Sequence, residues 1–164
     1  MSQAAFKRSD TAYQALLELD QLIAHDNLSQ IGREAGRFLA AAQTAAPERR
    51  ARLVEILDQV TSVNASLARA QEYSRKGDYA GAWESLDRAT KLFPNEIEIN
   101  KLRSDLTTKA PVFVAAIENA RRSEESSQLA VSLSWYLKAQ RIYPASEIAQ
   151  EAQSRIASRL LKDP

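Results

Sequence analysis

The chain contains no cysteine and a single histidine. The lack of cysteine excludes disulfides, thiolate nucleophiles and cysteine-ligated metal sites. His25 has no second histidine with which to hold a metal, and a lone general base would need an orienting partner. We therefore expect His25 to have a structural role at a helix end, where it can interact with the final carbonyls. The sequence predicts no metal, no cofactor and no enzymatic activity.

Glycine is also scarce, and long apolar runs and net charge are lacking. Four glycines leave little room for a phosphate-binding loop or a dinucleotide motif, and neither motif occurs. No apolar run approaches the roughly 20 residues of a membrane span, so we expect no membrane insertion. The net charge of +1 does not predict the basic face that nucleic acids require.

The N-terminus lacks the apolar core of a signal peptide. This favours a cytoplasmic location, and it leaves open that the chain is a domain excised from a longer anchored or exported protein.

The residues that are abundant favour helix. Apolar residues make up 45% of the chain, and no clear run alternates in the manner of a strand. Ala, Leu, Glu, Gln and Arg, which are strong helix formers, dominate together with Ser. The fold class is therefore all-α, with about seven helices predicted from the apolar periodicity. They cover about 10–24, 31–47, 47–77, a fourth that begins at about 78, 95–120 (interrupted at Pro111), 129–143 and 146–161.

Residues that cap or stop helices support these boundaries. Asn27 or Ser29 can cap the second helix, Asp78 the fourth, and Asn95 with Glu98 forms a capping-box-like pair for the fifth. The third helix has an apolar seam with steps of three and four residues, which is typical of packing against a neighbouring helix. The seam comprises Leu53, Ile56, Val60, Val63, Leu67 and Ala70.

The chain repeats itself. The stretch "RATKLFPNE" at 88–96 has a near-double in "KAQRIYPAS" at 138–146, and a fainter copy is "AAAQTAAPE" at 40–48. A period of about 47–50 residues is typical of stacked helical hairpins. In this interpretation Pro47, Pro94 and Pro144 each end a second helix and begin the next hairpin.

The central copy resembles a tetratricopeptide repeat. The stretch "KGDYAGAWESLDRATKLFP" is the recognisable part, and the matching residues are Ala70, Tyr73, Gly77, Tyr79, Ala82, Leu86, Ala89 and Pro94. The next copy keeps Ala120, Leu129, Ser132, Tyr136, Ala139 and Pro144, with Ser123 and Ser127 where the aromatic and the glycine stood. The resemblance covers about residues 63–144. A standard repeat has about 34 residues, so the extra segment at about 95–110 is expected to be an added or lengthened helix.

The resemblance implies a fold of stacked antiparallel helical hairpins in one helical-repeat domain, 1–164. Its parts would be an N-terminal hairpin (1–47), two repeat units (48–94 and 95–144) and a capping helix (145–164). Trp83, Trp135 and Tyr136 are expected to pack in the core or between hairpins, the alternative being a ligand cage. One subgroup of tetratricopeptide repeat proteins binds acidic chain ends through paired Lys and Asn residues. This sequence does not have Lys and Asn at those positions.

The resemblance further implies a non-catalytic module that binds a peptide or helix of another protein along a groove. Arg75, Arg121 and Glu124 would set the orientation of the partner. Carried over by position, the groove would present Asn64, Leu67, Gln71, Ser74 and Arg75 from one unit and Val114, Ile117, Arg121, Glu124 and Glu125 from the next. The alternative interpretation is that these residues form a solvated face or pack against the extra helices, and the sequence favours it over a groove.

An alternative function uses the seam at 53–70 for self-association. The chain would then be a structural or homo-oligomeric scaffold, in the simplest case a homodimer. A scaffold of this kind would be favoured if the apolar spacing of the seam continued unbroken through both long predicted helices, 47–77 and 95–120. Pro111 argues against this because proline interrupts a helix.

Overall fold

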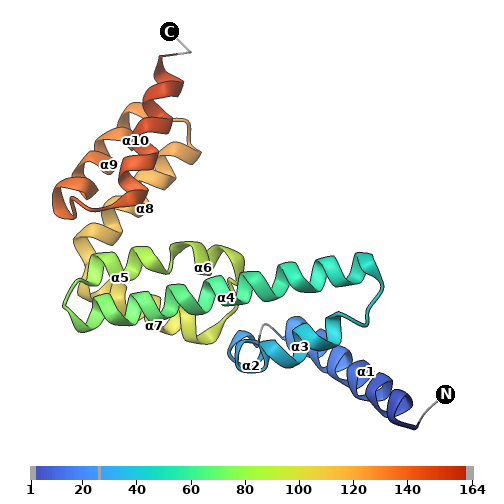
Figure 1. Ribbon diagram of the computed structural model, residues 1–164. Helices are drawn as coiled ribbons and strands as arrows, with labels where there is room; N and C mark the ends of the chain where they lie inside the picture. Colours follow the sequence, from blue (N-terminus) through green and yellow to red (C-terminus); the bar gives the residue numbers. More distant parts are fainter. Residues whose placement is uncertain (1–2, 26, 162–164) are drawn as a thin grey trace. The chain divides into compact units, whose positions relative to one another are not determined.

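The computed structural model describes residues 3–25 and 27–161, and within them the chain is helical with no strand (Figure 1). The all-α prediction is confirmed. The helices in chain order are α1 (Gln3–Ala24), α2 (Leu28–Arg33), α3 (Ala35–Ala42), α4 (Pro47–Arg75), α5 (Tyr79–Ser85), α6 (Asp87–Leu92), α7 (Ile97–Lys109), α8 (Pro111–Glu125), α9 (Leu129–Ile142) and α10 (Glu147–Leu160).

The predicted helix boundaries hold where a local residue determines them. Asn27 accepts the N–H of Gln30, and Asp78 accepts the N–H of Gly81 at 2.9 Å, so both predicted caps form. The side chain of Ser29, the alternative cap, lies outside the described part. Gly77 has a φ of +78°, as a left-handed helix stop requires. Pro111 opens α8 as a fresh helix.

Two predicted helices are each divided in two, and a third is divided where its interruption was predicted. The second is interrupted at Glu34, in a stretch where Gly32 and Gly36 lower helix propensity. The fourth is interrupted at Leu86, whose N–H bonds back only three residues, to the carbonyl of Trp83. The fifth is divided at Pro111. The Asn95–Glu98 capping box was wrong by one residue, because α7 begins at Ile97 and it is Glu96 that accepts the N–H of Glu98, at 3.5 Å.

The internal repeat reappears in the backbone hydrogen bonds. In the turn before α7, the Phe93 N–H donates to the Ala89 carbonyl at 2.9 Å. In the turn before α10, the Tyr143 N–H donates to the Ala139 carbonyl at the same distance. Asn100 and Gln150 then bond with their side-chain amides to the carbonyls of Pro94 and Pro144. The turns before α5 and α9 also match each other, because Gly77 and Ser127 both have a positive φ, of 78° and 58°. Residues about 50 positions apart therefore adopt the same local conformation.

The chain divides into two compact units. Unit 1 comprises 1–67 and 88–100, and unit 2 comprises 68–87 and 101–164. In unit 1, α1 packs against α2 and α3. Its core holds Leu16, Leu19, Ile31, Phe38, Leu53, Val60, Val63 and Ile99. The seam predicted on α4 is thus largely buried, with Ile56 and Leu67 partly buried against the same core.

Unit 2 is built on the α8–α9 hairpin, with α10 packed on α9. Trp83 and Tyr136 are buried, as predicted, and Trp135 is half-buried. An edge-to-face aromatic chain runs through this core, from Trp83 to Phe113 (6.1 Å between ring centroids) and from Phe113 to Tyr143 (5.7 Å). The proposed division of 1–164 into repeat units stays a prediction.

Gly81 is needed at the point where the start of α5 meets Tyr143. A Cβ at position 81 would lie 2.6 Å from the Tyr143 hydroxyl and 2.7 Å from an oxygen of Asp78. These two groups are hydrogen-bonded to each other at 3.2 Å. We expect Gly81→Ala to lower the free energy of unfolding by about 1–3 kcal/mol in urea denaturation, because the methyl group overpacks this contact.

Gly36 in α3 provides the matched control. A Cβ there would meet nothing within 4 Å. Gly36→Ala should be neutral or stabilise the protein by up to about 1 kcal/mol, as expected from helix propensity. In a Tyr143→Phe background the Gly81→Ala penalty should shrink. A Gly81→Ala protein as stable as wild type would contradict the close contact.

Candidate functional site

The most elaborate polar arrangement in unit 2 is a set of arginines around two carboxylates. We name it the arginine–carboxylate network, and it consists of Asp87 (α6), Arg103 (α7), Arg121 and Glu124 (α8), Tyr136 (α9), and Arg155 and Arg159 (α10). Two of the predicted partner-binding residues, Arg121 and Glu124, lie in the middle of it.

Asp87 forms the buried end of the network. It is 8% exposed and stands in the first turn of α6. Arg121 donates to both of its carboxylate oxygens, each at 2.8 Å, in the parallel geometry that suits a guanidinium. Arg103 donates to the same carboxylate at 3.5 Å, and its guanidinium carbon lies 4.0 Å from the centroid of the Trp83 ring.

Burial and pairing have opposite effects on these two arginines. Burial lowers the pKa of Arg103, and the attraction of Asp87 offsets only part of that effect. Burial is also the largest effect on the pKa of Arg121 and acts to lower it, but the hydrogen bonds with Asp87, the charge of Asp87 and the interaction with Tyr136 together raise the pKa. Arg121 is therefore the stronger partner of Asp87.

Glu124 forms the more accessible end. Arg155 donates to its two oxygens at 3.1 and 2.9 Å, Tyr136 donates its hydroxyl at 3.3 Å, and Arg159 approaches to 3.5 Å. The hydrogen bonds from Arg155 lower the pKa of Glu124. Burial, followed by the charge of Glu124, raises the pKa of Tyr136. Each of the two carboxylates is thus shared by two arginines.

The helix that carries Arg155 and Arg159 is anchored at its start by Glu84 of α5. Glu84 accepts the N–H of Ile148 at 2.7 Å, and Ser146 accepts the N–H of Ala149 at 3.1 Å. A carboxylate at a helix N-terminus is favoured by the helix dipole. Burial nevertheless raises the pKa of Glu84, and the hydrogen bonds from the start of α10 offset this only in part.

The other predicted residues lie apart from the network. Asn64 is half-buried in unit 1, where its amide abuts Gly32, because a Cβ on Gly32 would lie 2.2 Å from the Asn64 nitrogen. In unit 2, Gln71, Arg75 and Glu125 are exposed and Ser74 is half-buried. The structure therefore brings together Arg121 and Glu124 from the predicted set.

Asp87, Arg103, Arg155 and Arg159 were missed by the sequence reasoning. Their contacts join residues 16 to 35 positions apart. Because these pairs join different helices, the spacing of residues within one helix could not predict them.

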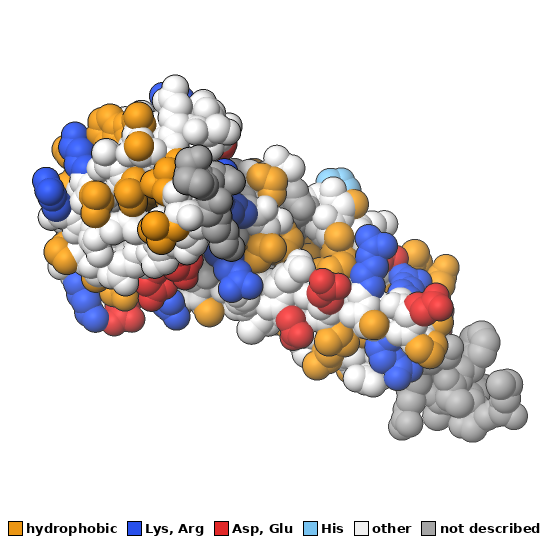
Figure 2. All heavy atoms as spheres, turned by 90° about the horizontal axis from the view of Figure 1, so that it is seen from above, with side chains coloured by type: hydrophobic (Ala, Val, Ile, Leu, Met, Phe, Trp, Pro, Cys, Tyr) orange, Lys and Arg blue, Asp and Glu red, His pale blue; other side chains and the backbone are white. Residues whose placement is uncertain are grey.

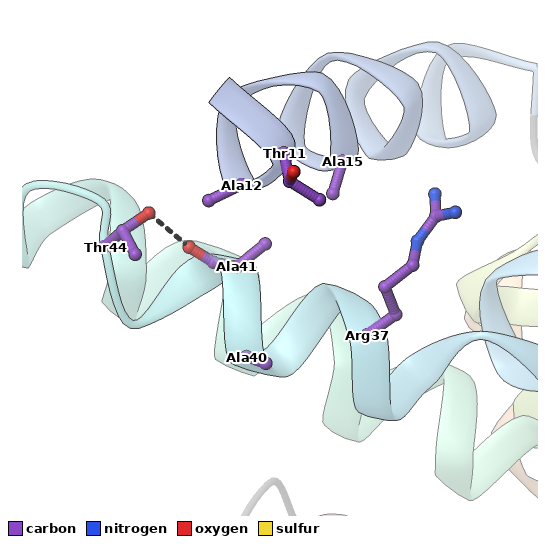
Figure 3. A pocket seen from close by; sticks show the side chains of 7 residues that line it. All are labelled: Thr11, Ala12, Ala15, Arg37, Ala40, Ala41 and Thr44. Carbon is purple, nitrogen blue, oxygen red and sulfur yellow. Dashed lines mark hydrogen bonds between the residues drawn. The ribbon is translucent and has the colours of Figure 1, made fainter. Parts of the chain in front are cut away.

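A hollow of about 500 Å³ between α1 and α3 of unit 1 is a weaker candidate (Figure 3). Its polar groups are already engaged, since the Thr44 hydroxyl donates to the Ala41 carbonyl and Arg37 pairs with Glu18 and Glu34. It lacks the convergent polar groups that usually orient a ligand. It is lined by Thr11, Ala12, Ala15, Arg37, Ala40, Ala41 and Thr44.

Two further predictions concern single sites. His25 lies at the end of α1 with Nδ1 2.7 Å from the carbonyl oxygen of Gln21, which confirms the expected helix-end position. No group of three or more His, Asp or Glu side chains in the described residues is placed to hold a metal ion.

No protein-family model, no curated protein and no solved structure matches this chain. The resemblance to tetratricopeptide repeats therefore rests on the residues quoted above. Across residues 3–25 and 27–161, no helix has both the length and the apolar character needed to cross a membrane.

The raised pKa of Glu84 makes a pH-dependent contribution to stability. Because the folded-state pKa lies above the ordinary value of 4.5, protonation favours the folded state. Wild type should therefore gain stability relative to Glu84→Gln as pH falls from 7 toward about 4.5. Free energies of unfolding in urea at several pH values would measure this difference.

Glu124→Gln is the control of opposite sign. The pKa of Glu124 is lowered, so its contribution is present at neutral pH and is lost only below about 4.5. The difference between wild type and Glu124→Gln should stay constant from pH 7 to about 5. A constant difference for Glu84→Gln over the same range would refute the burial effect.

Asp87 should be among the most sensitive polar positions of the chain. Asp87→Ala removes the carboxylate that Arg103 and Arg121 share while both guanidinium groups stay largely buried. We expect a loss of roughly 3–5 kcal/mol in the free energy of unfolding, as for other buried pairs that lose one partner. Glu125→Ala, at an exposed position on α8, should change it by less than about 0.5 kcal/mol. Equal effects of the two substitutions would show that the network does not stabilise unit 2.

Proposed function

We propose that the chain is a non-catalytic interaction module, similar to tetratricopeptide repeat proteins, that binds an acidic segment of another protein. The binding surface would lie on α8 and α10, around the exposed end of the arginine–carboxylate network. The observation that supports this proposal is the two-to-one ratio of arginines to carboxylates in the network.

The excess of arginine is accessible at one end only. The side chains of Arg155 and Arg159 are 51% and 48% exposed, whereas those of Arg103 and Arg121 are 19% and 26% exposed. Arg159 approaches Glu124 at 3.5 Å, and about half of its side chain is exposed. Carboxylates of a partner would find two adjacent guanidinium groups there.

In this proposal Arg121 and Glu124 position the site and do not contact the partner directly. Their charged atoms are already paired with Asp87 and Arg155. Exposed Gln71, Arg75 and Glu125 remain available for partner contacts, as the resemblance implied.

The rival function, self-association through the seam of α4, receives less support. Leu53, Val60 and Val63 are each at most 3% exposed and belong to the core of unit 1. A surface already covered by the chain's own helices has little apolar area left to bury in a dimer.

The proposal predicts that binding depends on Arg155 and Arg159. Immobilised wild-type protein should capture an acidic protein from an extract of the source cells, and capture should weaken as salt rises. Arg155→Glu/Arg159→Glu should reduce that capture at least about tenfold, because like charges would then face the partner.

Arg69→Glu/Lys101→Glu is the matched control, since it makes the same charge change at two exposed positions outside the network. It should bind as wild type does. Light scattering should give a concentration-independent mass near 18.2 kDa. Equal capture by both double variants would rule out the α8–α10 surface, and a stable dimer would favour the scaffold.

A further inference from the structure

Helix α9 buries only part of its circumference in unit 2. Ser132, Tyr136 and Ala139 are buried, and the Ser132 hydroxyl donates to the carbonyl of Ala120 in α8 at 2.8 Å. A neighbouring side faces α10, where Gln140 accepts a hydrogen bond from Gln153 at 2.9 Å. Among the described residues, α8 and α10 are the helices that pack extensively against α9.

Helix α9 also carries large apolar side chains in a row. We name it the α9 face and define it by Val131, Trp135, Lys138 and Ile142, whose steps of four, three and four residues place them on one side of the helix. Val131 and Ile142 are 46% and 41% exposed, and Trp135 is half-buried. Lys138 Nζ lies 4.7 Å from the centroid of the Trp135 ring.

The charged side chains of the segment that carries this row have one sign. Residues 126–146 contain no Asp or Glu, and their only charged side chains are Lys138 and Arg141, both exposed. Figure 2 shows hydrophobic side chains in several groups on the surface, with basic and acidic side chains beside them. Exposed apolar side chains grouped with charge of one sign are typical of interaction surfaces.

We infer that the α9 face is a docking surface for an acidic amphipathic helix of another protein. Apolar residues of that helix would cover Val131 and Ile142, with the half-buried Trp135 as the anchor. Its Asp and Glu residues would pair with Lys138 and Arg141. The row spans about 16 Å, which matches about three turns of a partner helix. None of these residues belongs to the arginine–carboxylate network, so the inference does not depend on the function proposed above.

The charge of the α9 face disfavours a second copy of the chain and an anionic membrane as its partner. In a two-fold dimer the face would meet its own copy, and basic residues would oppose basic residues with no acid between them. An anionic membrane surface is typically recognised by clusters of about 4–8 basic residues. Two basic residues flanking an apolar row suit a single acidic helix better.

The test uses two synthetic helical peptides of about 16 residues, a length that covers the row. Both have leucines spaced by three and four residues. One carries glutamates beside the leucines and the other carries lysines. Fluorescence anisotropy of the labelled peptides with the full chain should show at least about tenfold tighter binding of the glutamate peptide.

Variants locate the binding on the face. Val131→Ser/Ile142→Ser should weaken binding of the glutamate peptide at least about tenfold. Val112→Ser on α8 is the control and should leave binding unchanged, although Val112 is 59% exposed. Lys138→Glu/Arg141→Glu should reverse the preference, so that the lysine peptide binds more tightly. Binding should also shift Trp135 emission to the blue, and Trp135→Phe should abolish the shift because Trp83 is already buried.

Several results would overturn the inference. One is equal binding of the two peptides to the wild-type protein. Another is a preference for the glutamate peptide that persists in Lys138→Glu/Arg141→Glu. Binding of vesicles containing phosphatidylserine that is lost in Val131→Ser/Ile142→Ser would assign the face to a membrane. Concentration-dependent dimerisation that is lost in the same variant would assign it to a second copy. The comparison of the two peptides uses the wild-type protein, so it tests the inference even if a variant does not fold.

Discussion

The buried carboxylate of Asp87 constrains the arrangement of unit 2. Removing a carboxylate from water is costly unless charged partners replace the lost solvation. Arg103 and Arg121 supply that replacement from α7 and α8, so three helices must keep a common geometry for the charge to be tolerated. The Trp83 ring beneath Arg103 ties the same arrangement to the apolar core.

This constraint extends to the accessible end of the network. Arg121 and Glu124 lie one turn apart on α8, so fixing Arg121 on Asp87 also fixes where Glu124 stands. Glu124 then holds Arg155 in a two-point contact. A guanidinium held in this way loses little side-chain entropy when it binds a further anion. Preorganisation therefore makes a paired arginine a better binding group than a free surface arginine would be.

Much of the fold was predictable because it is determined locally. Proline at position 111, the cap at Asp78 and the left-handed glycine at position 77 act within one turn of the chain, and each does in the structure what its chemistry predicts. The break at Leu86 was not predictable, because leucine is a good helix former and the sequence there carries no glycine or proline.

The site was less predictable than the fold. The family resemblance identified Arg121 and Glu124 as noteworthy, but it assigned them to a partner and not to Asp87 and Arg155. Those contacts join residues 34 and 31 positions apart, and only tertiary packing decides which arginine meets which carboxylate. Arg155 and Arg159 lie on one face of α10 by their four-residue spacing, yet the same spacing is common on any solvated helix.

The two surfaces of unit 2 differ in the kind of energy they offer a partner. At Arg155 and Arg159 the attraction is between half-exposed charges, which salt screens over about 8 Å at physiological ionic strength. On the α9 face most of the energy would come from covering Val131, Trp135 and Ile142, and burial of apolar area does not weaken with salt. The basic residues beside them would then select a partner by its charge more than they would hold it. Unit 2 can therefore present a salt-sensitive contact on α10 and a salt-resistant contact on α9. A partner that engaged both would bind with a combined affinity that neither contact provides alone.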